Sequence, residues 1–416
     1  MESVGTPFEY IPLSTDPSGF EFRLLVVHGA SYATEPLVCD LETEVLETAA
    51  PYDCISYVWG EGAPSKLISL NGFEVLIGEN LWNALKKLRG EKTRRLWVDA
   101  ICVNQKNTEE RTSQVSKMRD LYAGAAEVAV WLGERGDFGR GPRKNAKRLE
   151  EFLKYLKEGA KTLSLTFSFV DTTKPFKPSI FKVISSAELE KLKREIDNCS
   201  DWFYSPWWMR IWVLQEASVS RRHPLFHFGD EKTSWEIFNH LRKVLPGLIR
   251  SERALRKASH SFRQIWPSPK FKLLSEFIDA TFGQLESIRS KYQNHSHLSL
   301  KYLYEKSWRR MCTDPRDRYY VLLGLTSPPC QIKADYETPV DKLRRLYDKH
   351  NSFPDCTHDE LLALLRKDEE RRDRKNEARR AERAADPLLF TKEDEEIHRG
   401  IRGVARSSFL RRPLRG

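Results

Sequence analysis

Three short clusters of polar and aromatic residues contain the side chains best suited to chemistry. They span residues 56–61, 99–105 and 210–216, and the second is followed by Glu110 and Arg111. Each cluster lies at the predicted end of a core element, and open parallel sheets bind ligands in the crevice beyond the carboxyl ends of their strands. We therefore expect the clusters to meet at one crevice. Its candidate residues are Trp59, Gly60, Asp99, Asn104, Gln105, Arg111, Arg210, Trp212 and Glu216.

Two carboxylates in these clusters have the strongest case for a functional role. Glu216 lies beside aromatic residues, which makes it a candidate functional carboxylate with a perturbed pKa. Asp99 is predicted to lie inside an apolar strand, where it needs a buried partner. Several other residues in and near these clusters can be explained by structural roles without any function. Core packing explains Trp59, Trp97, Trp131 and Trp212, and helix-surface charge explains Glu110 and Arg111.

No motif with a well-understood mechanism occurs in the chain. The absence of a P-loop, a G-x-G-x-x-G after a strand, a G-x-S-x-G and an H-E-x-x-H argues against common ATPases, dehydrogenases, serine hydrolases and zinc proteases. The 7 cysteines are scattered, with no C-x-x-C pair and no histidine at a zinc-ligand spacing. We therefore expect no metal site, no disulfide framework and a reducing compartment, with buried thiols at Cys54 and Cys102.

The composition is that of a folded protein with two or three structural units. The chain has 416 residues, of which 40% are apolar and 31% charged, which excludes a miniprotein, a collagen-like fibre and a wholly disordered chain. The longest apolar runs, such as 128–132, are too short to cross a bilayer, and no signal-peptide pattern is visible near the start. We expect no membrane span and a cytoplasmic location.

The net charge of +10 is concentrated toward the end of the sequence. From Arg366 onward there are 16 Lys and Arg against 11 Asp and Glu, a surplus of 5, and from Arg399 onward there are no acidic residues. Such an arm could contact nucleic acid or anionic lipid. Acidic residues interrupt most of it and no stacking aromatics accompany the arginines, so a solvated tail is the favoured interpretation.

The periodicity of apolar residues predicts an α/β core. A strand, a helix and a strand follow one another between residues 96 and 132, which favours parallel pairing with a right-handed crossover. An Asn-Gly pair at 71–72 predicts a tight hairpin, Asn80 is a candidate cap for the following helix, and residues 134–185 read as an insertion. The predicted strands are 20–27, 53–59, 67–70, 73–77, 96–103, 127–132 and 224–229, and the predicted helices are 81–88, 108–122, 143–158, 187–198, 211–219, 235–292, 297–311 and 358–385.

Several blocks of the sequence, in order, resemble the fungal heterokaryon incompatibility (HET) domain. The resemblance covers about residues 8–340. Its main blocks are Tyr52–Gly60, Leu96–Gln105 with Glu110, Arg111, Gln114 and Val115, Tyr122–Gly133, and Trp207–Ala217. Asn71-Gly72, Asn80-Leu81, Asp314-Pro315-Arg316-Asp317 and Leu323-Gly324-Leu325 also resemble the wider family. The chain after residue 340 is short and holds no repeat or partner domain, which leaves a ligand-sensing role without support.

This resemblance implies an intracellular fungal protein of non-self recognition that triggers incompatibility and programmed cell death. It also implies distant kinship to TIR domains, hence a TIR-like or flavodoxin-like, mostly parallel sheet flanked by helices, with a mainly helical C-terminal part. Some TIR domains cleave NAD with a glutamate that follows a tryptophan in a helix, as Glu216 follows Trp212 here. The carboxylate would stabilise the oxocarbenium-like charge as nicotinamide leaves. Asp99, Asn104 and Arg111 would then line the pocket.

The expected organisation is an N-terminal lead-in over 1–50, a HET domain over 51–230, a helical extension over 231–345 and a charged, partly disordered tail over 346–416. The favoured function is death signalling by regulated self-association or by contact with other incompatibility proteins. The alternative is an NAD glycohydrolase, with NAD as substrate and no certain cofactor. Nucleic-acid binding through the tail is a weaker third hypothesis.

Overall fold

A computed structural model describes residues 8–14, 19–134, 201–203, 205–239, 242–243, 275–327, 329–330 and 332–385. The chain divides into two compact units, Met1–Val340 and Asp341–Gly416. Most of the predicted insertion at 134–185, the predicted helices at 143–158 and 187–198, and the tail beyond 385 lie outside the described residues.

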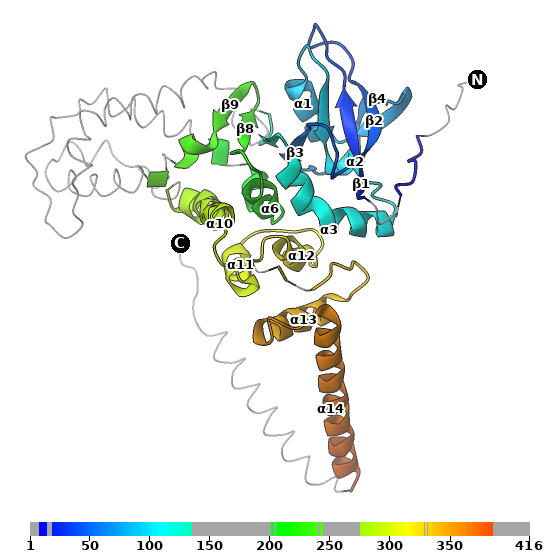
Figure 1. Ribbon diagram of the computed structural model, residues 1–416, viewed down its shortest axis with the longest axis vertical. Helices are drawn as coiled ribbons and strands as arrows, with labels where there is room; N and C mark the ends of the chain where they lie inside the picture. Colours follow the sequence, from blue (N-terminus) through cyan, green and yellow to red (C-terminus); the bar gives the residue numbers. More distant parts are fainter. Residues whose placement is uncertain are drawn as a thin grey trace, which may run out of the picture. The chain divides into compact units, whose positions relative to one another are not determined.

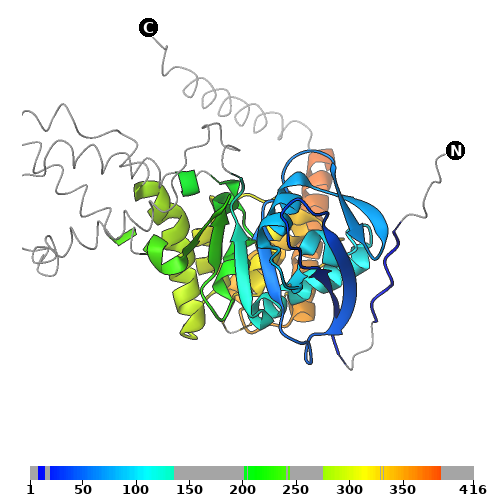
Figure 2. The same ribbon diagram turned by 90° about the horizontal axis from the view of Figure 1, so that it is seen from above.

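The first unit is built on a mixed sheet of nine strands in the order β5-β4-β2-β1-β6-β3-β7-β8-β9. In Figure 2 the blue strands, which come early in the sequence, lie at one side of the sheet, and the green strands β8 and β9 lie at the other. The central strands β6, β3, β7 and β8 are parallel, and β1 and β9 join this block antiparallel on either side. The strands are β1 Glu21–Val27, β2 Val38–Val45, β3 Asp53–Tyr57, β4 Lys66–Leu70, β5 Phe73–Ile77, β6 Arg94–Trp97, β7 Glu127–Trp131, β8 Leu225–Phe228 and β9 Glu231–Ser234.

Helices connect the parallel strands and extend the unit beyond the sheet (Figure 1). The short helix α6 contacts α3, α10 and α12, and Figure 1 shows it among these three. The helices of this unit are α1 Glu79–Leu88, α2 Asp99–Cys102, α3 Thr108–Gly124, η2 Asp201–Phe203, η3 Pro206–Met209, α6 Val213–Ser218, η4 Asp279–Gly283, α10 Gln284–Gln293, α11 Leu300–Ser307 and α12 Asp317–Leu323.

These elements confirm the predicted α/β class, including its parallel central strands and its helical C-terminal part. The predicted hairpin forms between β4 and β5, with Asn71 at φ 51° and Gly72 at φ 80°, the left-handed backbone that this turn requires. The side chain of Asn107 accepts a hydrogen bond from the Glu110 amide and caps α3. Cys54 and Cys102 are buried, also as predicted.

Several local predictions were wrong. The strand predicted over 96–103 ends at Trp97, because a short helix, α2, begins at Asp99. Helix α1 begins at Glu79 rather than after Asn80, and the Asn80 side chain instead joins the Val58 carbonyl to the Trp131 indole. Strand β2 was not predicted, because its charged residues obscure the alternation of apolar and polar positions. Strand β9, which ends at Ser234 just before the helix predicted from residue 235, was not predicted either.

The core of the first unit includes a dense aromatic cluster between the sheet and the helices that follow it. Trp208 stacks on Phe203 and Phe226 and meets Phe238 edge to face. Trp207, Trp97 and Trp131 are also fully buried, in contrast to Trp59, which is 46% exposed and therefore no core residue. Packed rings with offset or edge-to-face geometry resist rearrangement. The cluster thus fixes the turn that leads into α6.

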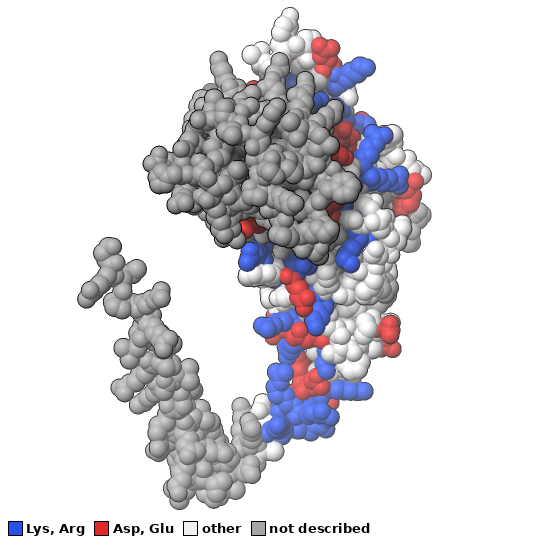
Figure 3. Space-filling model, turned by 90° about the vertical axis from the view of Figure 1, so that its left-hand side faces the viewer, with Lys and Arg blue, Asp and Glu red and all other residues white. Residues whose placement is uncertain are grey.

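The second unit contains α13 Val340–Ser352 and α14 His358–Ala385. Apolar residues are confined to the start of α14, where Leu361 and Leu365 are buried, and the rest of its described side chains are mostly charged and exposed. Figure 3 shows basic side chains, with acidic ones among them, on the described surface. The long polar helix predicted over 358–385 is confirmed.

Candidate functional site

The site begins at the carboxyl end of β3, where Ser56 is buried between Ile55 and Tyr57. Its hydroxyl donates a short hydrogen bond to Oε2 of Glu216 on α6, although 160 positions separate the two residues. The hydroxyl oxygen of Ser56 in turn accepts a hydrogen bond of 2.7 Å from the indole Nε1 of Trp207. A buried hydroxyl therefore links the central sheet to both η3 and α6.

Arg210 occupies the other side of the Glu216 carboxylate. Its Nη2 lies 3.7 Å from Oε1 of Glu216, and its Nη1 donates to the carbonyl of Tyr57 at the end of β3. We call Ser56, Trp207, Arg210 and Glu216 the buried polar network. Glu216 is only 1% exposed, so both oxygens of its carboxylate are directed at protein groups rather than at water.

Burial governs the protonation of this network. Desolvation raises the pKa of Glu216, while Arg210 and the Ser56 hydrogen bond oppose the rise. Desolvation acts to lower the pKa of Arg210, but the carboxylates of Glu216 and Asp99 outweigh it and hold that pKa above its ordinary value. A guanidinium placed near two carboxylates stays charged and stabilises their ionised forms.

A second pair, Trp59 and Asp99, lies near the buried polar network. Nε1 of Trp59 donates to Oδ2 of Asp99 at 3.0 Å, joining the loop after β3 to the start of α2. Burial raises the pKa of Asp99, and Arg210 and the Trp59 hydrogen bond lower it in part. Because Trp59 is about half exposed and Asp99 is partly exposed, this pair is the accessible part of the site.

The remaining predicted residues near this edge have local structural roles. Gly60 adopts φ 87°, a left-handed backbone that favours glycine in the loop after β3. The Gln105 side chain donates to the Asp99 carbonyl at 2.8 Å. The Asn104 amide donates to Oε1 of Glu110, which in turn forms a buried ion pair with Arg23. Glu110 is therefore a buried structural partner and not the helix-surface charge expected from the sequence.

Arg111 and Trp212 belong to a neighbouring cluster centred on Asp317. Nε1 of Trp212 donates to Oδ2 of Asp317 at 3.0 Å, and the hydroxyl of Tyr336 donates to Oδ1 at 2.5 Å. The Arg111 guanidinium lies 4.8 Å from the centre of the Tyr336 ring. Burial raises the pKa of Asp317, and its two hydrogen bonds oppose that rise. These contacts do not bring Arg111 to Glu216.

Members of all three sequence clusters thus meet at the carboxyl ends of β3 and β6. Four residues that complete the two groups of contacts were not among the candidate site residues: Ser56, Trp207, Asp317 and Tyr336. Ser56 belongs to the first sequence cluster, and Trp207 and Asp317 belong to blocks that resemble the HET family. One signal for Ser56 was present, since a hydroxyl inside a buried strand needs a hydrogen-bond partner. The role of Tyr336 had no local signal, because its partner Asp317 belongs to another element.

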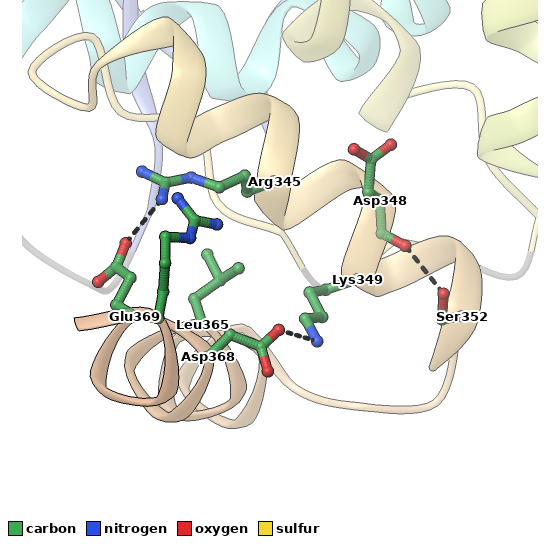
Figure 4. A pocket seen from close by; sticks show the side chains of 8 residues that line it. Arg345, Asp348, Lys349, Ser352, Leu365, Asp368 and Glu369 are labelled. Carbon is green, nitrogen blue, oxygen red and sulfur yellow. Dashed lines mark hydrogen bonds and ion pairs between the residues drawn. The ribbon is translucent and has the colours of Figure 1, made fainter. Parts of the chain in front are cut away.

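A hollow of about 280 Å³ lies between α13 and α14 in the second unit, and Figure 4 shows its lining. Arg345 pairs with Glu369 at 3.1 Å, and Lys349 pairs with Asp368. Arg372 and Asp348 complete a lining with as many acidic as basic side chains. The charged side chains of the two helices already neutralise one another, so the hollow has little net charge to attract an ionic ligand. We therefore interpret it as the packing interface between α13 and α14 rather than as a binding site.

Within the described ranges, no group of His, Cys, Asp or Glu side chains has a metal-binding arrangement. None of the helices described here combines the length and the apolar character needed to cross a membrane.

Comparison with known proteins identifies the segment that carries the buried polar network. Residues 52–216 match the family model of the heterokaryon incompatibility protein (HET). The chain is 26% identical over 369 residues to heterokaryon incompatibility protein 6, OR allele, of Neurospora crassa, an alignment that covers 81% of this chain and 52% of the relative. The chain therefore spans about half the length of that curated relative. No solved structure matches. Residues 52–216 are therefore similar to the HET family, and the likeness to an incompatibility protein extends over most of the chain.

Proposed function

We propose that the chain is a signalling module of fungal non-self recognition that triggers incompatibility and programmed cell death through regulated self-association. The HET match and the named incompatibility relative support a role in incompatibility. The observation that carries the choice of mechanism is the burial of Glu216, which is 1% exposed. A carboxylate enclosed by its own domain stabilises the fold, as expected for an assembly module.

The contacts of Glu216 explain why this burial favours assembly over catalysis. One carboxylate oxygen accepts from Ser56 and the other lies 3.7 Å from Arg210. A substrate would have to displace one of these partners and leave a buried group unpaired, which is costly. The network is therefore suited to holding α6 against β3 so that the surface of the domain has one shape.

The test is expression of the full chain in a fungal host, with cell viability and the mass of the purified protein as readouts. We expect loss of viability together with concentration-dependent assembly. A Ser56→Ala variant, which removes the donor to Glu216, should reduce both. The matched control is Ser116→Ala, since the Ser116 hydroxyl contacts only a carbonyl within its own exposed helix turn. Full viability with a strictly monomeric intact protein would refute this mechanism.

NAD hydrolysis is the second candidate function, and one observation favours it. Glu216 and Asp99 both have raised pKa values and both interact with Arg210, beside the half-exposed Trp59. In this mechanism the bond between C1 of the ribose and the nicotinamide nitrogen breaks, nicotinamide keeps the electron pair, and water adds to C1 with loss of a proton. Glu216 would stabilise the positive charge that develops on the ribose.

Incubation of the assembled protein with NAD, followed by measurement of nicotinamide, separates the two candidates. The enzyme hypothesis expects release that Glu216→Gln abolishes while the fold remains intact. Trp59, Gly60, Asp99, Asn104, Gln105, Arg111, Arg210 and Trp212 are its proposed substrate-binding residues, of which Asp99 is the most accessible to test as Asp99→Asn. No nicotinamide from the assembled intact protein would eliminate this candidate.

The proposed domain organisation keeps a lead-in over 1–50, the HET domain over 51–230, a helical extension over 231–345 and a charged segment over 346–416. A basic surplus near the end of the sequence keeps nucleic-acid binding as a weaker candidate. Deletion of 399–416 should then lower a salt-sensitive affinity for RNA or DNA. An unchanged affinity would rule this role out.

A further inference from the structure

Helix α6 carries Glu216 but is too short to be stable by itself. It contains only the six residues Val213–Ser218, whereas isolated helices in water need about 12 residues or more. Tertiary contacts must therefore hold it. Within the described residues, a later part of the chain contacts the backbone that precedes α6 and the backbone at its C-terminal end. This part is the segment 284–325, which contains α10, α11 and α12.

Arg310 fixes the backbone on the N-terminal side of α6. Its side chain is buried, and its Nη1 donates to the carbonyl of Trp208 at 2.7 Å and approaches that of Arg210 at 3.5 Å. Its Nη2 donates to the carbonyl of Thr281 at 3.1 Å. One guanidinium thus holds the turn that contains both Trp207 and Arg210, two members of the buried polar network.

Arg289 fixes the C-terminal side of α6. Its Nη1 lies 2.8 Å from the carbonyls of both Ala217 and Ser220, 2.9 Å from the Ser220 hydroxyl and 3.3 Å from the Ser218 carbonyl. The last carbonyls of a helix lack partners within the helix and carry a partial negative charge. A buried guanidinium at this end therefore satisfies them and complements the helix dipole.

Two further contacts join the region around α6 to the later segment, one between backbone groups and one with a side chain. The amide of Ile211 donates to the carbonyl of Met311 at 2.9 Å, directly beside Arg310. A Cβ atom at Gly324, directly after α12, would lie 2.1 Å from Nε2 of Gln215, so a larger residue there would require the buried Gln215 side chain to move. The later segment is thus fitted to α6 along its length.

We propose that Arg289 and Arg310 are positioning residues of the HET domain, and that segment 284–325, outside the matched residues 52–216, is an obligatory part of the functional module. We call the two side chains the arginine clamp. They act on Glu216 and Arg210 through the backbone at each end of α6. The proposal rests on these contacts alone and is independent of whether the module assembles or cleaves NAD.

The chemistry of arginine explains why this residue occupies both positions. A planar guanidinium presents several donors in fixed directions and can bridge carbonyls from different elements, which a lysine ammonium does less well. Burial lowers the pKa of Arg289 to about 10 and that of Arg310 to about 10, so both remain cationic at neutral pH. Each cation is accommodated mainly by backbone carbonyl dipoles.

The test is hydrogen exchange of the full chain, comparing peptides from α6 with peptides from β1 and β2. Arg310→Met and Arg289→Met remove the clamp on either side, and we expect amide exchange in α6 to accelerate at least tenfold while β1 and β2 exchange as before. Arg309→Met is the matched control, because Arg309 is exposed and lies over the Trp308 ring. The control should leave α6 unchanged.

A second set of variants in the same experiment replaces each arginine by lysine and so keeps the positive charge. Arg310→Lys and Arg289→Lys should give intermediate exchange in α6, since an ammonium reaches fewer of the carbonyls. These variants also serve if a methionine variant does not fold. Exchange in α6 equal to that of the Arg309→Met control in all four variants would overturn the proposal, as would equal acceleration throughout the sheet. Either result is separable from viability and nicotinamide release, which report on the proposed function.

Discussion

Arginine and lysine pair with carboxylates in two very different regions of this protein. In the first unit, the side chains of Arg210 and Glu216 are 21% and 1% exposed. In the second unit, Arg345 and Glu369 are 31% and 42% exposed, and Lys349 and Asp368 are 23% and 47% exposed. The pairs share their chemistry, but only the first is shielded from water on its acidic side.

This difference determines what each pair contributes. Removing one partner of a buried ion pair leaves an uncompensated charge and costs about 3–5 kcal/mol. An exposed pair contributes about 0–1 kcal/mol, because water screens the charges and both side chains lose freedom when they pair. The buried polar network therefore specifies where α6 lies, while the pairs between α13 and α14 add little beyond solubility and helix registry.

The largest effect should come from Glu216→Ala, which leaves Arg210 and Ser56 without their buried partner. We expect the free energy of unfolding of the first unit to fall by about 3–5 kcal/mol. Denaturant unfolding followed by tryptophan fluorescence measures it. Glu369→Ala is the matched control and should change stability by less than about 1 kcal/mol. Equal effects of the two substitutions would contradict the comparison.

A smaller loss is expected for Trp207→Phe, which keeps a buried ring but removes the indole donor to Ser56. The lost hydrogen bond and the smaller ring together should cost about 2 kcal/mol. Thermal unfolding of the variant gives this value. Trp308→Phe changes an indole that is 60% exposed and should have almost no effect. A neutral Trp207→Phe result would show that Ser56 does not need its second partner.

A pH-dependent loss of stability is expected from His227 on β8. Burial, with smaller contributions from Arg94 and Lys232, lowers the pKa of His227 to about 4. The unfolded chain therefore binds more protons than the folded chain between pH 6.5 and 4, so stability falls as the pH drops through this window. The loss should be about 2 kcal/mol.

His227→Gln should remove most of this loss when unfolding is measured at pH 7 and again at pH 4.5. The control is His28→Gln, since His28 is about half exposed and lies beside Asp40. If the pH dependence of stability is the same in His227→Gln, groups other than His227 must cause it. The contrast between buried and exposed groups would then hold for ion pairs but not for single buried ionisable side chains.

The smallest effect is expected for Lys349→Ala in the second unit, which breaks the exposed pair with Asp368. The change should be less than about 1 kcal/mol, and it should shrink further in 1 M salt because exposed charges are screened. Urea unfolding followed by circular dichroism at low and high salt measures it. A large, salt-independent loss would show that this packing interface behaves like the buried polar network.

The local signals in the sequence predicted most of the elements correctly. The Asn71-Gly72 turn, the parallel strands around β3 and the long polar helix α14 follow from short-range rules of turn chemistry and periodicity. Strand ends were less predictable. The sequence from Leu96 to Val103 is apolar throughout apart from Asp99, so nothing in its pattern distinguishes a strand from the short helix α2 that follows β6.

The candidate site was predictable in its members but not in its contacts. Residue types and spacing in the sequence selected Glu216, Arg210, Asp99 and the residues at the end of β3 as candidates for the site. Only the tertiary structure decided that Glu216 faces Ser56 and Arg210, and that Arg289 and Arg310 hold the helix between them. Residue type and spacing encode local backbone preference, whereas the burial and pairing of a charge depend on segments up to 160 positions away. Those segments become neighbours only when the sheet and its helices pack.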